Sequence, residues 1–144
     1  DKFDLVYSNS YWYFFSENKK KLKPGINFAK YFLKNGFLPF TQPSSIWKKN
    51  VYKNCGGLNY EIFKIIGDKD LFMRMAYSSK LKFKYVNVVS SIFLKHGNSL
   101  GDNNVERYHQ ELKLCPKQNI VFTSILYKII ETVNKCYFRI NYKL

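Results

Sequence analysis

Two acidic residues, Asp68 and Asp70, lie where a loop is expected to enter a helix. A carboxylate in this position can accept a proton as a general base, provided that its surroundings fix its position and its pKa. The same carboxylate can instead cap the helix, a role that aspartate favours on its own account. The residues alone favour the cap for Asp68. Asp70 is expected to complement the helix dipole or to pair with Arg74, four residues further along.

Three further side chains could contact a ligand. His96 closes an expected strand and precedes a loop of Gly, Asn and Ser, where an imidazole could hold a divalent cation or a diphosphate. Ser99 lies in the same loop. Gln42 begins an expected extended segment, and it is either an ordinary polar strand end or a contact to substrate.

The elements that must position these residues alternate between strands and helices, which indicates a mixed α/β fold. Residues 16–25 are polar, rich in lysine and closed by Pro24-Gly25, so they predict a loop or the tip of a hairpin. Asp102 is a plausible helix cap. Runs of β-forming residues predict strands, and apolar spacing predicts helices: strands over 3–15 and 83–94, helices over 26–35, 68–80 and 102–114.

The clearest predicted helix begins at Asn119. Its apolar residues recur at helical spacing, with polar residues on the other face. Such a stripe more often packs on a core or a partner than on a membrane, although Lys135, Arg139 and Lys143 favour a membrane surface slightly. We expect residues 115–144 to form a C-terminal amphipathic helix added to a domain of residues 1–114. The stripe consists of Phe122, Ile125, Leu126, Ile129, Ile130 and Val133.

The net charge of +14 comes from 24 basic and 10 acidic residues. Only three of the basic residues are arginine, although base recognition and bidentate phosphate contacts favour arginine. The lysines are spread along the chain, so a solvated lysine surface is a better interpretation than a nucleic-acid interface.

Cysteine usage and hydropathy exclude several classes of protein. Cys55, Cys115 and Cys136 lie far apart and include no C-x-x-C pair, which argues against a disulfide framework and a zinc site and is typical of a reducing cytosol. No stretch reaches the roughly 18 uncharged apolar residues that a membrane-spanning helix needs.

Four short motifs follow one another between Gln42 and Ser99. In this order and near this spacing, they resemble the C-terminal half of the catalytic domain of family 2 glycosyltransferases, which have the GT-A fold. The motifs are Gln42-Pro43-Ser44-Ser45 before Trp47-Lys48-Lys49, then Gly56-Gly57-Leu58-Asn59-Tyr60-Glu61, then Asp68-Lys69-Asp70-Leu71-Phe72-Met73-Arg74, and finally Leu94-Lys95-His96 with Ser99. Gly67 and Leu94 depart from the family, which often has Glu and Arg at these positions.

The resemblance implies a metal-dependent, inverting transfer of a sugar from a nucleotide-sugar donor to the hydroxyl of a glycan or lipid-linked acceptor. Such enzymes build bacterial surface polysaccharide in the cytoplasm or at the inner face of the cell membrane. The resemblance favours Asp68 as the general base rather than a cap. It makes Gln42, His96 and Ser99 substrate contacts, and His96 also a candidate ligand for Mg²⁺ or Mn²⁺.

The nucleotide-binding half of the family, which ends in an Asp-x-Asp metal motif, has no counterpart in the sequence. We therefore expect a partial GT-A-type mixed sheet flanked by helices, in which residues 1–114 form the acceptor side. Without the donor and metal site, this fragment is expected to be inactive.

Two alternatives stay open. A basic, aromatic-rich module could bind single-stranded nucleic acid, with bases stacked on aromatic rings and lysines along the phosphates. The chain could also bind an anionic membrane surface through lysines and the C-terminal helix. Under the leading hypothesis, the partners are the sugar donor and the acceptor, and no nucleic acid binds. This hypothesis is compatible with peripheral contact to a membrane.

Overall fold

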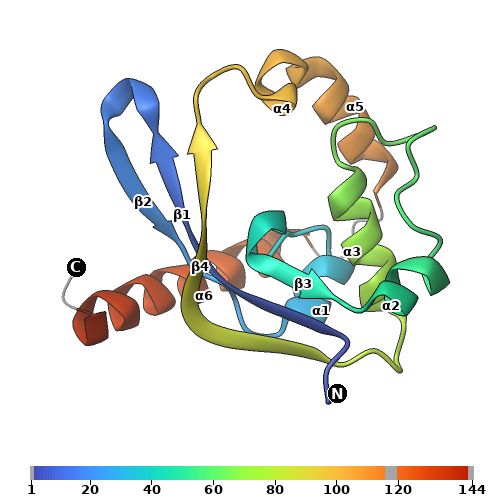
Figure 1. The fold of residues 1–144 in the computed structure, drawn as a ribbon, viewed down its shortest axis with the longest axis horizontal. Coiled ribbons are helices and arrows are strands. Elements are labelled where there is room, and N and C mark those ends of the chain that lie inside the picture. Colours follow the sequence, from blue (N-terminus) through green and yellow to red (C-terminus); the bar gives the residue numbers. More distant parts are fainter. Residues whose placement is uncertain (1, 116–119, 143–144) are drawn as a thin grey trace.

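The computed structural model describes residues 2–115 and 120–142, with a four-stranded mixed sheet at the centre (Figure 1). The central strand pairs antiparallel with two strands along one edge and parallel with the longest strand along the other. The sheet therefore confirms the predicted mixed α/β class. Its strands are β1 (Leu5–Phe14) in the centre, β2 (Lys19–Lys23) and β3 (Ser45–Trp47) on one edge, and β4 (Phe83–Lys95) on the other.

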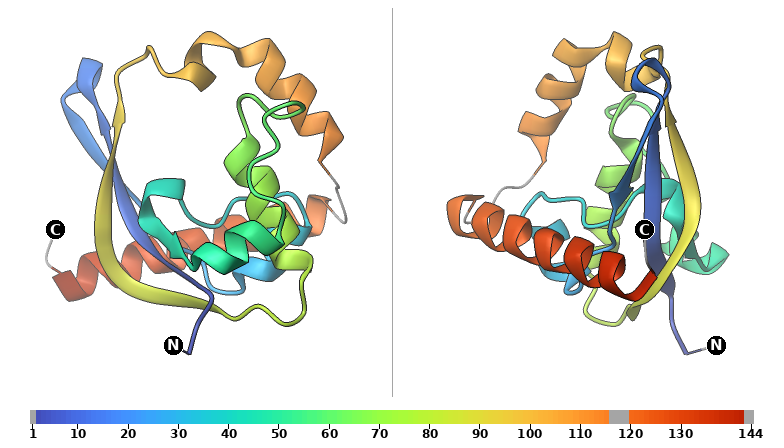
Figure 2. Two further views of the ribbon diagram at one scale, coloured as in Figure 1. Left: turned by 45° about the vertical axis from the view of Figure 1, so that its right-hand side comes forward. Right: turned by 90° about the vertical axis from the view of Figure 1, so that its left-hand side faces the viewer.

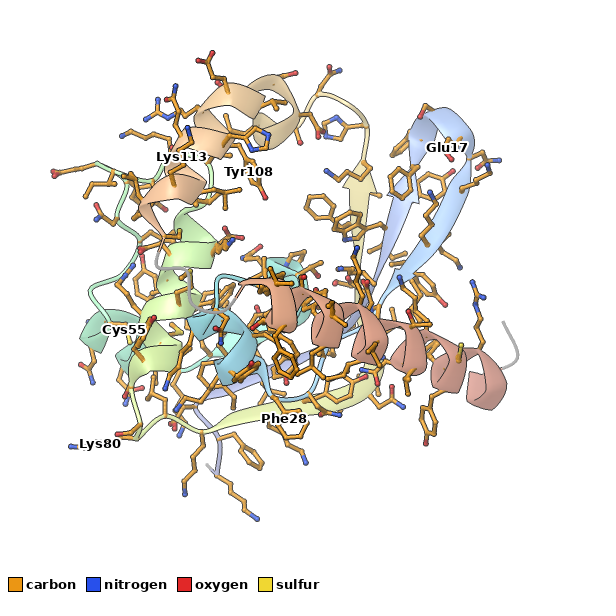
Figure 3. All side chains as sticks on the ribbon, turned by 180° about the vertical axis from the view of Figure 1, so that it is seen from behind. Glu17, Phe28, Cys55, Lys80, Tyr108 and Lys113 are labelled. Atoms are coloured by element: carbon orange, nitrogen blue, oxygen red, sulfur yellow. The ribbon has the colours of Figure 1, made fainter. Side chains whose placement is uncertain are left out.

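Within residues 2–115 and 120–142, six helices accompany this sheet. α1 packs against α3, and α6 runs along the back of the molecule in Figure 1 and comes to the front in Figure 3. α4 and α5 carry the chain from the end of β4 across to α3 (Figure 2). The helices are α1 (Ala29–Lys34), α2 (Lys49–Asn54), α3 (Gly67–Tyr77), α4 (Leu100–Asn103), α5 (Val105–Leu114) and α6 (Ile120–Tyr142), with 3₁₀ turns η1 (Phe15–Glu17) and η2 (Gln42–Ser44).

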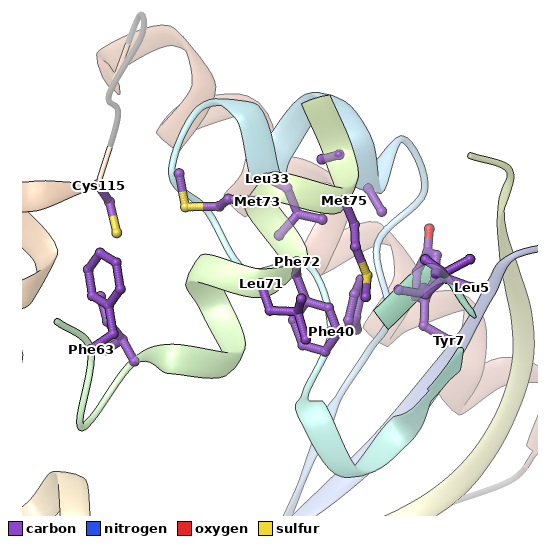
Figure 4. Close-up of a cluster of buried hydrophobic side chains, with 14 residues drawn as sticks. Leu5, Tyr7, Leu33, Phe40, Phe63, Leu71, Phe72, Met73, Met75 and Cys115 are labelled. Atoms are coloured by element: carbon purple, nitrogen blue, oxygen red, sulfur yellow. The ribbon is translucent and has the colours of Figure 1, made fainter. Parts of the chain in front are cut away.

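The main core lies between α3 and the sheet (Figure 4). Phe72 of α3 is fully buried, with its ring centroid 4.9 Å from that of Phe40 and 5.4 Å from that of Trp47. Phe40 stacks in turn on Tyr7 of β1 at 4.6 Å. This chain of rings fixes α3 relative to β1, and buried aromatic pairs add about 0.5–1.5 kcal/mol each beyond the area that they bury.

The lysine-rich segment predicted as a loop or the tip of a hairpin does include the turn of the β1–β2 hairpin at residues 16–18, but residues 19–23 form the strand β2, so the prediction is wrong there. The lysines are compatible with a strand because their ammonium groups lie over aromatic rings of β1. Lys20 lies 4.4 Å from the ring centroid of Tyr11, and Lys21 lies 4.6 Å from that of Phe14. Lysine can thus cover an aromatic surface with its stem while its charge stays near water.

A buried polar network lies where the pairing of β1 with β4 changes register. Ser8 pairs with Val86, but Ser10 pairs with Ser91, so β4 bulges beside Asn9. The Asn9 side-chain oxygen accepts the backbone N–H of Gly25 at 2.9 Å and the hydroxyl of Tyr85 at 2.8 Å. Its amide nitrogen donates to Asn87 at 3.0 Å. The polar groups of Asn9 are therefore satisfied inside the sheet, as burial requires.

Helix α6 confirms the predicted helix, but its apolar stripe is not a core face of this domain, which was one of the two packing roles expected of it. Phe122, Ile125, Ile129 and Val133 are more than half exposed, and Leu126 and Ile130 are half-buried. The side toward the domain carries the polar groups instead. We call the exposed apolar side chains the outer face of α6, and they are Val121, Phe122, Ile125, Ile129, Val133 and Tyr137.

Three polar side chains attach the opposite side of α6 to the domain. Tyr127 donates to the carbonyl of Leu38 at 2.9 Å, and Asn134 donates to the carbonyl of Gly25 at 2.9 Å. Glu131 forms an ion pair with Lys23 at 2.6 Å. These partners lie about 90 to 110 residues away along the chain, so the local pattern of residues gave no sign of them.

Replacing Gly25 with alanine should destabilise the domain by about 1–3 kcal/mol through overpacking. A Cβ at Gly25 would lie 2.7 Å from the Tyr85 ring and 3.0 Å from the carbonyl oxygen of Ser8. The ring cannot swing aside without losing the hydrogen bonds of its hydroxyl to Asn9 and Asn87. Urea unfolding measures the loss. Gly67→Ala is the control, since its nearest neighbours lie at 3.6 Å or beyond; equal stability of the two variants would contradict the prediction.

Candidate functional site

Asp68 and Gln42 line the same cavity, as their shared role in the predicted site requires. The cavity has a volume of about 290 Å³ and lies between the start of α3, η2 and the loop before α3. Trp47 and Tyr60 add aromatic rings to its wall, and the Tyr60 side chain is largely exposed. We call it the Asp68 cavity.

Hydrogen bonds to β1 hold the turn that carries Gln42. Thr41 donates to the hydroxyl of Ser10 at 2.9 Å. Ser44 donates to the carbonyl of Thr41 at 2.8 Å, and its own carbonyl accepts from Ser8 at 3.3 Å. The turn is therefore fixed from beneath, while the Gln42 side chain is exposed on it.

Asp68 is the second residue of α3 and does not cap it, because Ile66 occupies the cap position and no side chain caps this end. One carboxylate oxygen, Oδ1, accepts the backbone N–H of Lys69 at 2.7 Å. Burial raises the pKa of the Asp68 carboxyl above its ordinary value, against the opposing effects of the backbone N–H groups and the charge of Lys69. The group is thus a stronger base than an exposed aspartate.

Arg74 connects α3 to the turn at Gly56-Gly57, which we call the Gly-Gly turn. Its guanidinium binds Asp70 through Nε at 3.0 Å and through a terminal nitrogen at 2.7 Å. It also donates to the carbonyls of Cys55 and Gly57. The predicted pairing of Asp70 with Arg74 is confirmed. Gly57 has a φ of +64°, and a Cβ there would lie 3.1 Å from the Tyr52 ring, so the turn needs glycine at this position.

Sequence reasoning missed Glu111 of α5, which holds the loop that enters α3. The Glu111 side chain is almost fully buried. Its carboxylate accepts the backbone N–H groups of Lys64 and Ile65, each at 2.9 Å, and of Ile66 at 3.1 Å. Arg107 donates to it at 2.9 Å. Arg107 and Glu111 have the i, i+4 spacing of a helical ion pair, but no local signal in the sequence marks the loop as a partner of Glu111.

His96 and Ser99 do not line the Asp68 cavity. His96 is exposed, and its Nδ1 accepts the backbone N–H of Asn98 at 3.2 Å. Ser99 is the N-cap of α4: its hydroxyl accepts the N–H of Asp102 at 3.3 Å and donates to the Asp102 carboxylate at 2.5 Å. The predicted helix over 102–114 is divided into α4 and α5, whose N-caps are Ser99 and Asn104, so the prediction of Asp102 as the cap is wrong. Asp102 is instead the reciprocal partner in a capping box.

The side chains of residues 2–115 and 120–142 do not fit a metal centre by themselves. No group of three or more His, Cys, Asp or Glu side chains in these ranges could hold a metal ion. The three cysteines are free thiols.

Comparisons with known proteins give no match, whether to protein-family models, to curated proteins or to solved structures. Within the described residues, no helix is both long enough and apolar enough to cross a membrane.

Replacing Glu111 with glutamine should destabilise the domain at neutral pH by about 1–3 kcal/mol, because buried N–H groups would lose a charged acceptor. Burial raises the pKa of Glu111, but the hydrogen bonds outweigh it and hold the pKa below its ordinary 4.5. The ionised group therefore stabilises the fold above pH 4.5, and this contribution is lost as the pH falls through the lower pKa of the folded state. Urea unfolding at several pH values should show the gap between wild type and variant closing in acid.

The control for this experiment is Glu106→Gln, an exposed carboxylate on the same helix. It should leave stability unchanged at every pH. A gap between wild type and Glu111→Gln that is independent of pH would contradict the role given to the Glu111 charge.

Proposed function

We propose that this chain forms the acceptor side of an inverting, nucleotide-sugar-dependent glycosyltransferase, with Asp68 as the general base. The observation that carries the proposal is a desolvated carboxylate with a raised pKa at the wall of an aromatic-lined cavity. The order of motifs from Gln42 to Ser99 supports it independently.

Under this proposal, Asp68 has a defined part in the reaction. Its Oδ1 is occupied by the N–H of Lys69, so Oδ2 is the atom that would receive the proton. As the acceptor oxygen attacks the anomeric carbon, its proton passes to Asp68. A new carbon–oxygen bond forms, and the bond to the nucleoside diphosphate breaks. A raised pKa suits this step, because a base is most effective when its pKa approaches the working pH.

The walls of the Asp68 cavity suit a sugar. Binding sites for small molecules combine apolar and aromatic walls with a few polar groups that fix orientation. Trp47 is held edge-on by Phe72 and supplies a rigid wall. Tyr60 supplies a second, exposed ring, and Gln42 supplies an amide that can both donate and accept hydrogen bonds.

The donor and the Mg²⁺ or Mn²⁺ implied by the resemblance are not assigned to the described residues, since these do not form the ligand set. When bound, such a metal would neutralise the charge on the leaving diphosphate. His96 and Ser99 stay predictions as contacts to the donor.

Asp68→Asn should lower the rate of sugar transfer by about 10²- to 10⁴-fold, the usual contribution of a general base. The variant should be at least as stable as wild type at neutral pH, because burial penalises the charge that the substitution removes. The measurement is release of nucleoside diphosphate from nucleotide sugars with Mn²⁺ and acceptor, using the protein expressed from its complete gene.

Glu106→Gln is the control, since Glu106 is an exposed carboxylate on α5, outside the four motifs and the lining of the Asp68 cavity. It should keep its activity. Full activity in Asp68→Asn, or equal losses in both variants, would reject Asp68 as the base. No activity in the wild type toward any nucleotide sugar would reject the glycosyltransferase itself.

A further inference from the structure

The outer face of α6 is an apolar surface that the structure leaves largely exposed. Its members are 55–75% exposed and recur three or four positions apart over the 23-residue helix. Residues at this spacing lie along one side of a helix. Contiguous exposed apolar patches on folded proteins mark interaction sites, whereas single exposed apolar residues are ordinary.

The helix does not need this surface in order to stay attached to its domain. Thr123 is fully buried on the inner side, and Phe138 is nearly so. The hydrogen bonds of Tyr127 and Asn134 and the ion pair of Glu131 with Lys23 belong to the same side. The apolar side chains of the outer face therefore contribute little to the packing of α6 on its own domain.

Basic side chains border the outer face of α6. Lys128 shares a shallow surface hollow with Ile129 and Val133. Near the end of the helix, Lys135 and Arg139 line a groove of about 680 Å³ together with Lys20 and Lys21 of β2. Glu131 is the sole acid among residues 120–142, and it lies on the inner side with Lys23.

We propose that the outer face of α6 docks onto an anionic lipid bilayer and lies in the plane of its surface. The apolar side chains would enter the boundary between head groups and acyl chains. The basic groove would receive lipid phosphates. An apolar face bordered by lysine and arginine is the arrangement of interfacial helices, and cations near an anionic leaflet strengthen binding.

Charge decides between a bilayer and a second copy of this chain as the occupant. The chain carries a net charge of +14, and Lys128 shares a surface hollow with Ile129 and Val133 of the apolar face. A second copy would bring these cations toward their equivalents, whereas acidic head groups would neutralise them. The inference depends on α6 and β2 alone and does not require the proposed sugar transfer.

The test is flotation of the protein with vesicles of phosphatidylcholine, with and without phosphatidylglycerol. We expect binding to the anionic vesicles that weakens as salt is added, and little binding to the neutral ones. Ile129→Glu should weaken binding at least tenfold, because it places a charge in the apolar face. Lys20→Glu and Lys21→Glu should each weaken it by at least about fivefold.

Val105→Glu is the matched control, since it exchanges an equally exposed apolar residue for the same charge on α5. It should bind anionic vesicles nearly as wild type does, and circular dichroism should show all variants folded. The proposal is overturned if wild type does not float with anionic vesicles, or if Ile129→Glu floats as well as Val105→Glu. A dimer in sedimentation that Ile129→Glu abolishes, without any flotation of the wild type, would identify a second copy as the occupant instead.

Discussion

The fold depends on satisfying three buried polar residues of β1 in the middle of the sheet, Ser8, Asn9 and Ser10. An unpaired polar group inside a protein costs about 1–3 kcal/mol, so each of these side chains must find partners. Asn9 finds them across the bulge in β4 and in the backbone of Gly25, whose carbonyl in turn accepts from Asn134 of α6. Ser8 and Ser10 bond to the turn η2. One polar tripeptide therefore joins the sheet, the attachment of α6 and the candidate site.

The candidate site combines supports of two kinds. Aromatic packing of Phe72 on Phe40 and Trp47 fixes the position of α3. Hydrogen bonds to charged side chains fix the loop that leads into the helix. Glu111 gathers the three N–H groups before the helix, and Arg74 gathers two carbonyls of the Gly-Gly turn. Glu111 and Arg74 thus satisfy backbone N–H and carbonyl groups near Asp68, so Asp68 itself has few hydrogen-bond partners. Desolvation of the Asp68 carboxylate outweighs the hydrogen bond from the Lys69 N–H, and its pKa is therefore raised.

The pattern of neighbouring residues in the sequence predicted the elements that depend mainly on their own residues. The helices at residues 29–34 and 67–77 and the strands at residues 5–14 and 83–95 follow from apolar spacing and β-forming runs. The pairing of Asp70 with Arg74 follows from helical geometry.

The strand β2 was missed because its lysines are stabilised by rings on the neighbouring strand. The role of Glu111 and the orientation of α6 were missed because their partners lie about 45 and 90 to 110 residues away. Of the predicted site residues, local motifs brought Gln42 and Asp68 to one cavity, but they carried no information on the distance to His96.

The orientation of α6 shows why amphipathic pattern alone does not identify a core face. A helix packs by whichever side has the better partners, and Glu131 with Lys23 and Tyr127 with Leu38 provide them on the polar side. The lysines of β2 that line the groove with Lys135 and Arg139 also bear on the nucleic-acid alternative. Lys20 and Lys21 cover the rings of Tyr11 and Phe14, so these aromatic faces are already occupied and do not offer bases a free stacking surface.

Figure 2 places α6 and the β3–α2 segment on opposite sides of β1. A bilayer in contact with α6 would therefore leave the segment that carries Trp47 on the far side of the strand, which makes membrane docking and chemistry at Asp68 separable by substitution.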